Sequence, residues 1–243
     1  MQAEDVGLRP NELLEEGVLP VLKDFDFALD PAAVLERLGG AQVEDHGRQQ
    51  ALLRMFEAAV VEARDLIHPA IAYAVHPVVH AEADRLIVAD GGALESPVVA
   101  SLFAEAPEVV LMIYTIGPKL EARVAEYGRA NEVVAGFALD LMGSIAVNQV
   151  GVVGYSLIEG MARERGVKAS IPLNPGTSHW PMSGQRVIAG LVPAKEIGVE
   201  VLDSGLLRPF KTIAFAVALG RNVLTPAEGS SCDYCETRDL CRL

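Results

Sequence analysis

Basic residues are scarce in this 243-residue sequence, which has 20 Lys and Arg against 33 Asp and Glu. The formal net charge at pH 7 is −13, and the isoelectric point is near 4.8. An acidic surface repels phosphate groups. We therefore expect neither nucleic acid nor an anionic membrane as a partner.

Long uncharged hydrophobic runs are also missing. No run of about 18 uncharged apolar residues occurs, so no transmembrane helix is expected. The most apolar stretch, Val133 to Val153, contains Asp140, Asn148 and several glycines, which predicts a helix buried in a packed protein. The N-terminal residues are acidic and lack a basic region followed by an apolar core, so we expect no signal peptide and a cytoplasmic protein.

Familiar catalytic motifs are absent as well. The sequence contains no Gly-rich phosphate loop, no nucleophile elbow and no catalytic triad spacing. It therefore assigns no catalytic residue, and whether the protein is an enzyme stays open.

Hydrophobic residues make up 51% of the chain and charged residues 22%, a balance typical of a globular protein. Strands and helices mix without regular βαβ alternation, which predicts an α+β fold. We expect a peripheral N-terminal arm at 1–30, one α+β domain at 31–224 and a cysteine-rich tail at 225–243. The predicted helices span 31–38, 46–66, 96–104, 118–127, 131–165 (as one or two helices) and 183–195, and the predicted strands span 70–75, 86–89, 109–114, 199–202 and 212–219.

Two of these predictions rest on clear patterns. The helix at 46–66 has Leu52, Leu53, Phe56, Val60 and Val61 at helical spacing. The run at 109–114 is continuously apolar, which fits a strand that is buried on both faces.

The three cysteines, Cys232, Cys235 and Cys241, all lie in the last twelve residues with the spacing C-x2-C-x5-C. Two cysteines three residues apart can direct both sulfurs at one ion from a single turn, and the third adds a ligand. Zinc would need a fourth ligand, such as a histidine or a carboxylate. An iron–sulfur cluster usually takes four cysteines, although a site with one open iron or another ligand is known. The alternative is three surface thiols, an arrangement that proteins usually avoid.

The segment Asn174 to Pro181 reads N-P-G-T-S-H-W-P and holds the one tryptophan. Gly176 allows the backbone to approach a ligand closely, and the prolines stiffen the loop. The loop therefore suits a small ligand. The alternative is a structural loop in which Trp180 fills the core.

This loop resembles the S-P-G-Y-G-D-W-P loop of the activation domain of cobalamin-dependent methionine synthase. Further along, Lys195 to Val199 is similar to the K-x-I-G-V of that family, and Asp203-Ser204 stands where T-E-S is usual. Leu206 to Thr212 resembles its M-M-x-P-x-K-S. Upstream, Tyr114 to Gly117 and Leu139-Asp140 are also similar. The resemblance covers roughly residues 105–243 well, and short stand-alone relatives often end in a C-x2-C tail.

The resemblance implies an activation-domain-like fold with a mixed or antiparallel sheet packed with long helices. It also implies a protein that acts on a corrinoid protein in trans, because the chain has no cobalamin-binding signature of its own. A cysteine-bound iron–sulfur cluster would pass an electron to cobalt in place of the family's flavoprotein. The implied ligand-binding residues are Asn174, Pro175, Gly176, Thr177, Trp180, Asp203, Ser204 and Lys211.

Two positions depart from the family. The arginine that pairs with the carboxylate of S-adenosylmethionine falls at Pro172 here, and the loop tyrosine falls at Thr177. Losing a charge-assisted bidentate contact costs on the order of 1.5–3 kcal/mol. The departures argue against S-adenosylmethionine as the ligand unless Arg186 or Arg208 replaces the arginine. A zinc-stabilised scaffold protein and a methyltransferase-like enzyme with another small ligand are the alternative functions.

Two smaller patterns remain. His76 and His80 are four residues apart with His68 nearby, and on a helix this spacing could bind a metal. Prolines 69 and 77 disfavour such a helix, so we expect ordinary, partly buried histidines. Asp140 lies in the apolar helix, and a buried carboxylate must be paired. Lys211 is a candidate partner, and a ligand cleft is the alternative.

Overall fold

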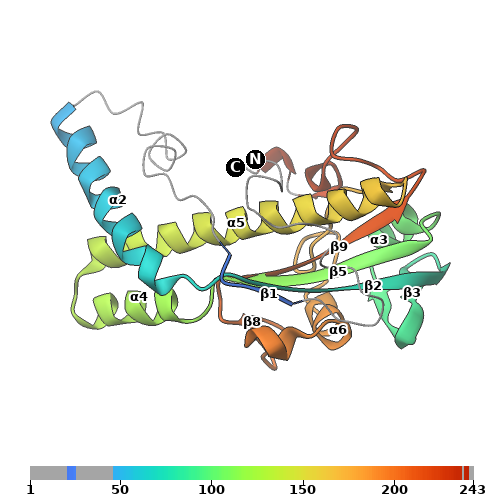
Figure 1. Ribbon diagram of the computed structural model, residues 1–243, viewed down its shortest axis with the longest axis horizontal. Coiled ribbons are helices and arrows are strands. Elements are labelled where there is room, and N and C mark those ends of the chain that lie inside the picture. Colours follow the sequence, from blue (N-terminus) through green and yellow to red (C-terminus); the bar gives the residue numbers. More distant parts are fainter. Residues whose placement is uncertain (1–20, 26–45, 237, 241–243) are drawn as a thin grey trace.

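The computed structural model describes residues 21–25, 46–236 and 238–240 (Figure 1). The helix predicted at 31–38 and Cys241 lie outside these residues. An antiparallel sheet forms the centre of the protein, with the long helix α5 (Val133–Glu164) along one face and α6 (Gly184–Leu191) against the other (Figure 1). These two layers produce two hydrophobic cores, one on each face of the sheet.

Within the described residues the sheet has seven strands. Six of them follow the order β4-β3-β2-β5-β9-β6, and the seventh, β1, pairs with the edge of β2 that β5 leaves open. The three central strands are aligned over most of their length, with Met112 opposite both Tyr73 and Phe215. A separate two-stranded sheet joins β7 and β8. The strands are β1 (Val21–Lys23), β2 (Ala70–Ala81), β3 (Arg85–Val88), β4 (Ala93–Glu95), β5 (Glu108–Thr115), β6 (Lys168–Ala169), β7 (Glu200–Val201), β8 (Leu207–Arg208) and β9 (Thr212–Gly220).

Strand β5 is buried on both faces from Val109 to Thr115, which confirms the prediction from its apolar run. Successive side chains of a strand point to opposite faces. The core beneath α2, α4 and α5 receives Val110, Met112 and Tyr114. The core beneath α3 and α6 receives Val109, Leu111 and Ile113.

A serine side chain caps the start of helix α3. Ser96 caps α3 by accepting a hydrogen bond from the Val99 N–H (3.1 Å), as its predicted position before Pro97 requires. The helices are α2 (His46–Leu66), α3 (Pro97–Phe103), α4 (Lys119–Arg129), α5 and α6, with short 3-10 turns at Ala89–Gly91, Ala194–Ile197, Ser231–Tyr234 and Arg238–Leu240.

The helix predicted at 183–195 is shorter in the structure. It ends at Leu191, because Pro193 disfavours helical backbone at Val192, which has φ −122° and ψ 159°. A separate 3-10 turn follows at Ala194–Ile197.

Strand β2 is longer than its predicted range of 70–75 and continues through Pro77. Val78 donates its N–H to the Pro107 carbonyl on the β5 side (2.9 Å). The nitrogen of Pro77 therefore points away from β5, so the missing N–H leaves that ladder intact.

Helix α5 packs closely on the sheet through small residues. A Cβ at Gly151 would clash with Tyr114, and a Cβ at Gly154 would lie 2.7 Å from Met112, both on β5. A Cβ at Gly143 would lie 2.7 Å from Leu120 of α4, so α5 packs closely on that helix as well. By length and composition α5 could cross a membrane. Many of its residues are buried against the sheet, however, and the core helix of a packed domain passes the same test.

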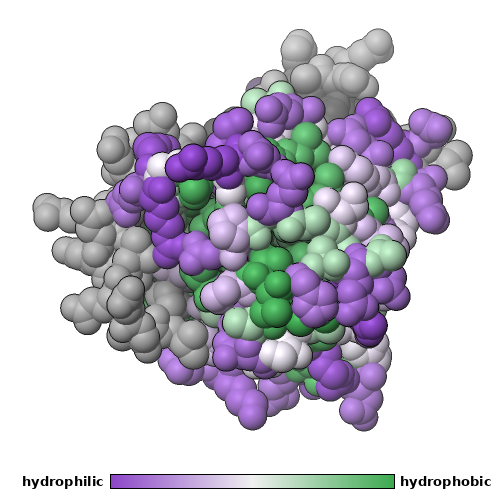
Figure 2. Space-filling model, turned by 90° about the vertical axis from the view of Figure 1, so that its right-hand side faces the viewer, coloured by the Kyte–Doolittle hydropathy of each residue, from purple (hydrophilic) through white to green (hydrophobic). Residues whose placement is uncertain are grey.

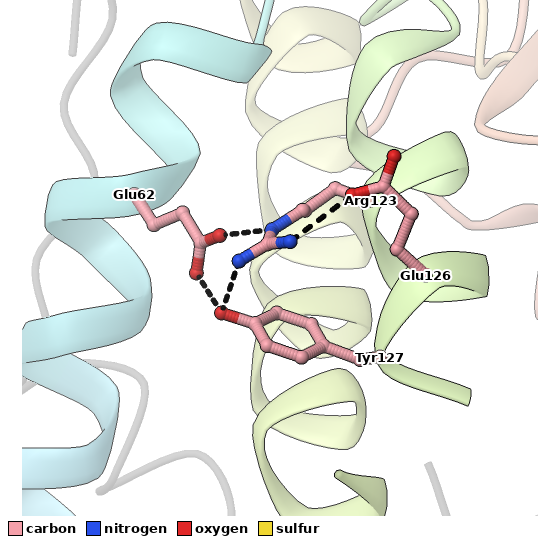
Figure 3. Close-up of polar contacts among 4 residues, drawn as sticks. All are labelled: Glu62, Arg123, Glu126 and Tyr127. Carbon is pink, nitrogen blue, oxygen red and sulfur yellow. Dashed lines mark hydrogen bonds and ion pairs between the residues drawn. The ribbon is translucent and has the colours of Figure 1, made fainter. Parts of the chain in front are cut away.

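A polar cluster joins α2 to α4 beside this core (Figure 3). Arg123 donates to Glu62 Oε1 (2.6 Å) and to Glu126 Oε2 (3.0 Å). Its guanidinium also lies 4.2 Å from the ring centroid of Tyr127, whose hydroxyl donates to Glu62 Oε2 (2.7 Å). The cluster fixes the rotation of α2, whose Phe56 and Val60 are buried, whereas Val61, expected on the apolar face, is 65% exposed.

Other large apolar side chains also reach the surface, among them Val79 on β2 and Val134 and Phe137 on α5. Figure 2 shows apolar atoms gathered at the centre of one end of the molecule, with hydrophilic atoms around them. This end of the molecule therefore carries an apolar patch within a hydrophilic rim. The start of α5, which carries Val134 and Phe137, lies at the opposite end (Figure 1).

We predict that Gly151→Ala lowers the free energy of unfolding by about 1–2 kcal/mol, because overpacking against the buried Tyr114 ring outweighs the higher helix propensity of alanine. Gly128→Ala in α4 is the matched control, since a Cβ at Gly128 meets no atom within 4 Å. It should be neutral or stabilise by up to about 1 kcal/mol. Urea denaturation followed by circular dichroism measures both variants, and equal stabilities would contradict the close packing.

Candidate functional site

The segment Asn174 to Pro181 forms a tight loop held by its own backbone. Gly176 has φ +91°, a conformation that L side chains rarely adopt, and donates its N–H to the Trp180 carbonyl (2.8 Å). Thr177 and Trp180 form an isolated antiparallel bridge, and the Thr177 hydroxyl donates to the Asn174 carbonyl (2.9 Å). The predicted stiffness of the loop thus comes from hydrogen bonds as well as from proline.

The sheet and α3 hold this loop in place. The Asn174 amide donates to the Ala214 carbonyl of β9 (2.9 Å), and Leu173 bridges to Ala216 on the same strand. Ser96 donates to the His179 carbonyl (2.7 Å), so the residue that caps α3 also anchors the loop.

Trp180 is fully buried and belongs to the core beneath α3 and α6, as the structural interpretation of the loop expects. A Cβ at Gly184 would lie 2.4 Å from its indole Nε1 and 2.9 Å from Pro175, so only glycine fits without displacing them. Contact of the indole with a ligand stays a prediction.

The structure brings the loop and the turn at Asp203-Ser204 together through Met182. Cβ atoms at Gly176 and Gly205 would lie 3.2 Å from Met182 Sδ and 3.0 Å from its Cγ, respectively. Both glycines have positive φ, which favours glycine. Because glycine has no side chain, the backbone of both segments can approach Met182 closely.

Lys211, also predicted in the site, lies apart from the loop. Its ammonium group pairs with Asp140 Oδ1 (2.9 Å) and donates to the Ser144 hydroxyl (2.8 Å) on α5, on the opposite face of the sheet. The expected pairing of Asp140 with Lys211 is thus present. The expected burial of Asp140 is wrong, because its side chain is 49% exposed.

Four buried side-chain atoms of the described residues lack a hydrogen-bond partner within the protein, and all belong to one short stretch. They are both ring nitrogens of His179, Trp180 Nε1 and Gln185 Oε1. Buried polar atoms are normally paired, and an unpaired group points to strain, a bound ion or water, or a functional role. The back of the loop is therefore chemically unusual, a property that the sequence did not reveal.

The two arginines that could replace the missing family arginine are engaged elsewhere. Arg186 donates to the Leu202 carbonyl (2.9 Å), and the guanidinium of Arg208 lies 5.6 Å from the ring centroid of Phe210. Neither interaction involves the loop.

The cysteine-bearing tail docks on this same loop. Cys232 lies in the 3-10 turn Ser231–Tyr234, and Cys235 follows it, donating its N–H to the Cys232 carbonyl (3.2 Å). Ser178 in the loop donates to Cys235 Sγ (3.6 Å) and accepts from the Glu236 N–H (3.1 Å). Loop and tail thus meet at one hydroxyl group.

The two described cysteines lie on one turn, as the C-x2-C spacing predicts. Within the part of the chain that the structure describes, no three His, Cys, Asp or Glu side chains form a metal-binding group. The third predicted sulfur, that of Cys241, lies outside it. The donor set of thiolates still fits zinc or an iron–sulfur cluster.

The histidine pattern has no metal-binding geometry. His76 and His80 lie on strand β2 rather than a helix, so four residues separate them by roughly 13 Å. Both nitrogens of His76 have partners, the Leu191 carbonyl (3.1 Å) and Asp90 (3.2 Å). His68 contacts Lys119 (2.8 Å).

The K-x-I-G-V segment lines a surface groove of about 530 Å³ between α6 and β7. Its charged residues are Lys195 and Glu200, and the remainder of its lining is small or apolar: Ala189, Ala194, Gly198, Val199 and Val201. The groove does not include the loop at 174–181.

We predict that acid destabilises the protein through His179. Burial lowers the pKa of His179 below its ordinary value of 6.5. Between the two values the unfolded chain binds more protons, so stability is full above pH 6.5 and declines as the pH falls through that window. Urea denaturation between about pH 5 and pH 8 measures this slope.

His179→Gln should flatten this dependence. His80→Gln is the matched control, because His80 is an exposed histidine on β2. An unchanged slope in the His179 variant would contradict the assignment.

Comparison of the sequence with protein-family models and with curated proteins gives no match. A solved structure described as the MetH reactivation domain bound to AdoHcy resembles this chain with a TM-score of 0.50 and 13% identity. The similarity covers 85% of this chain and 80% of that chain. The predicted α+β class and the suspected resemblance are confirmed, and the chain has the fold of the MetH reactivation domain.

Proposed function

We propose that this protein is an accessory protein that acts in trans on a corrinoid protein and carries a cysteine-bound iron–sulfur cluster for electron transfer. The main support is the contact between the tail and the loop, where Ser178 Oγ lies 3.6 Å from Cys235 Sγ. A metal held by the tail would therefore lie beside the loop that resembles the ligand loop of the activation domain.

The chemistry of the tail supports a metal. Cys232 lies in the 3-10 turn Ser231–Tyr234 and Cys235 directly follows it, and Cys241 would supply a third thiolate. Tyr234, between them, packs partly against the core beneath α3 and α6, so the turn is attached to the domain. When bound, an iron–sulfur cluster supplies single electrons, which a donor outside the chain must replace.

The loop supplies the proposed ligand side of the site. Asn174, Pro175, Gly176 and Thr177 are held rigidly, and Asp203 and Ser204 adjoin them through Met182. The structural neighbour is described with bound AdoHcy, which makes a related ligand reasonable to test.

A zinc-stabilised scaffold protein is the second candidate. It is favoured by Pro172 at the place of the family arginine and by the engagement of Arg186 with the Leu202 carbonyl. Such a protein would keep the fold and lose S-adenosylmethionine binding.

The identity of the bound metal distinguishes the iron–sulfur accessory protein from the zinc-stabilised scaffold protein. We predict that protein purified without oxygen is brown and contains iron and acid-labile sulfide. Cys232→Ser and Cys235→Ser should lose most of both, since each removes a thiolate ligand. His80→Gln is a control that should retain them. A colourless preparation with one zinc per chain and no iron would replace this proposal with the scaffold protein.

Calorimetric titration tests the loop. We predict that the natural protein binds S-adenosylhomocysteine weakly and that Pro172→Arg tightens binding about 10-fold, because it restores a charge-assisted contact with the carboxylate. Pro172→Ala is the matched control and should bind like the natural protein. Tight binding by the natural protein would show that another residue holds the carboxylate.

A further inference from the structure

We propose that Ser178 is a positioning residue for the metal ligand Cys235, and that its hydroxyl group couples the bound metal to the loop at 174–181. This inference rests on the proposed metal site, whether the metal is iron or zinc. It goes beyond that site by assigning a residue of the loop to the surroundings of the metal.

The hydrogen-bond inventory of Ser178 sets the direction of the contact. A serine hydroxyl has one proton and two lone pairs. The Glu236 N–H donates to Ser178 Oγ (3.1 Å), which uses a lone pair and leaves the proton for Cys235 Sγ at 3.6 Å. Sulfur is a large acceptor, so this separation suits an O–H···S bond, and a thiolate would strengthen it.

Contacts within the protein hold both partners in place. On the loop side, the neighbouring carbonyl of His179 accepts from Ser96 (2.7 Å). On the tail side, Ser230 and Asp233 form a capping box, and Asp233 also pairs with Arg238 (2.8 Å). The Ser178 hydroxyl therefore meets Cys235 without ordering a mobile segment, and the contact costs little conformational entropy.

Hydrogen bonds to a ligand sulfur have two measurable effects on a metal. They hold the ligand in its binding geometry, and loss of such an outer-shell partner typically lowers metal affinity 10–100-fold. They also draw electron density from the sulfur and so raise the reduction potential of an iron–sulfur cluster. Because coupling is reciprocal, metal binding must in turn stabilise the position of Ser178.

The test compares the full-length Ser178→Ala and Ser178→Thr variants with the natural protein. Ser183→Ala is the matched control, because Ser183 is exposed and its side chain makes no capping hydrogen bond to α6. Metal affinity is measured by competition with a chelator, and the midpoint potential by anaerobic spectroscopic titration. Hydrogen exchange at the Glu236 amide reports the second half of the contact.

We expect Ser178→Ala to bind metal about 10-fold more weakly, to show a more negative potential if iron is bound, and to exchange the Glu236 amide faster. Ser178→Thr should restore all three, and Ser183→Ala should change none. Unchanged affinity and potential in a metal-loaded Ser178→Ala protein would overturn this inference alone. A natural protein that binds neither iron nor zinc would overturn both this inference and the proposed metal site, whereas zinc alone would overturn only the iron–sulfur function.

Discussion

The architecture depends on one constraint, the burial of strand β5 on both faces. From Val109 to Thr115 every residue of this strand is buried, so neither face of the sheet can remain open to water. One face is covered by α5, whose glycines permit contact with Tyr114 and Met112, and the other by α3, α6 and the loop that ends in Trp180. The same burial that stabilises the sheet therefore also requires the loop to lie where it does.

The placement of the loop explains why the candidate site gathers where it does. Anchored to β9 at Asn174 and to α3 through His179, the loop presents Ser178 to the tail. The inner side of the same loop carries the unpaired ring nitrogens of His179 and Trp180, and its outer side contacts the cysteine turn. A rigid segment with two chemically distinct sides is suited to the proposed link between a metal and a small ligand.

Local patterns predicted most of the fold, and long-range contacts set the rest. A few consecutive residues are enough to predict β5, from its apolar run, and the start of α3, from its N-terminal cap. The passage of β2 through Pro77 depends on which side of the strand the nitrogen faces, which only the pairing with β5 determines. The exposure of Asp140 depends on how α5 is rotated on the sheet. Ser178 and Cys235 are 57 residues apart, so no local sequence pattern could predict the contact between them.

The position of Lys211 has a consequence for how such a domain can diverge. Its pair with Asp140 stabilises the junction of β9 and α5 on one face, while the loop occupies the other. The apolar side chains of the sheet separate the Lys211–Asp140 pair from the loop. Replacement of the family arginine by Pro172 beside the loop therefore leaves this ion pair unchanged. Such insulation lets one surface acquire new chemistry while the architecture persists, which is consistent with a shared fold at 13% identity.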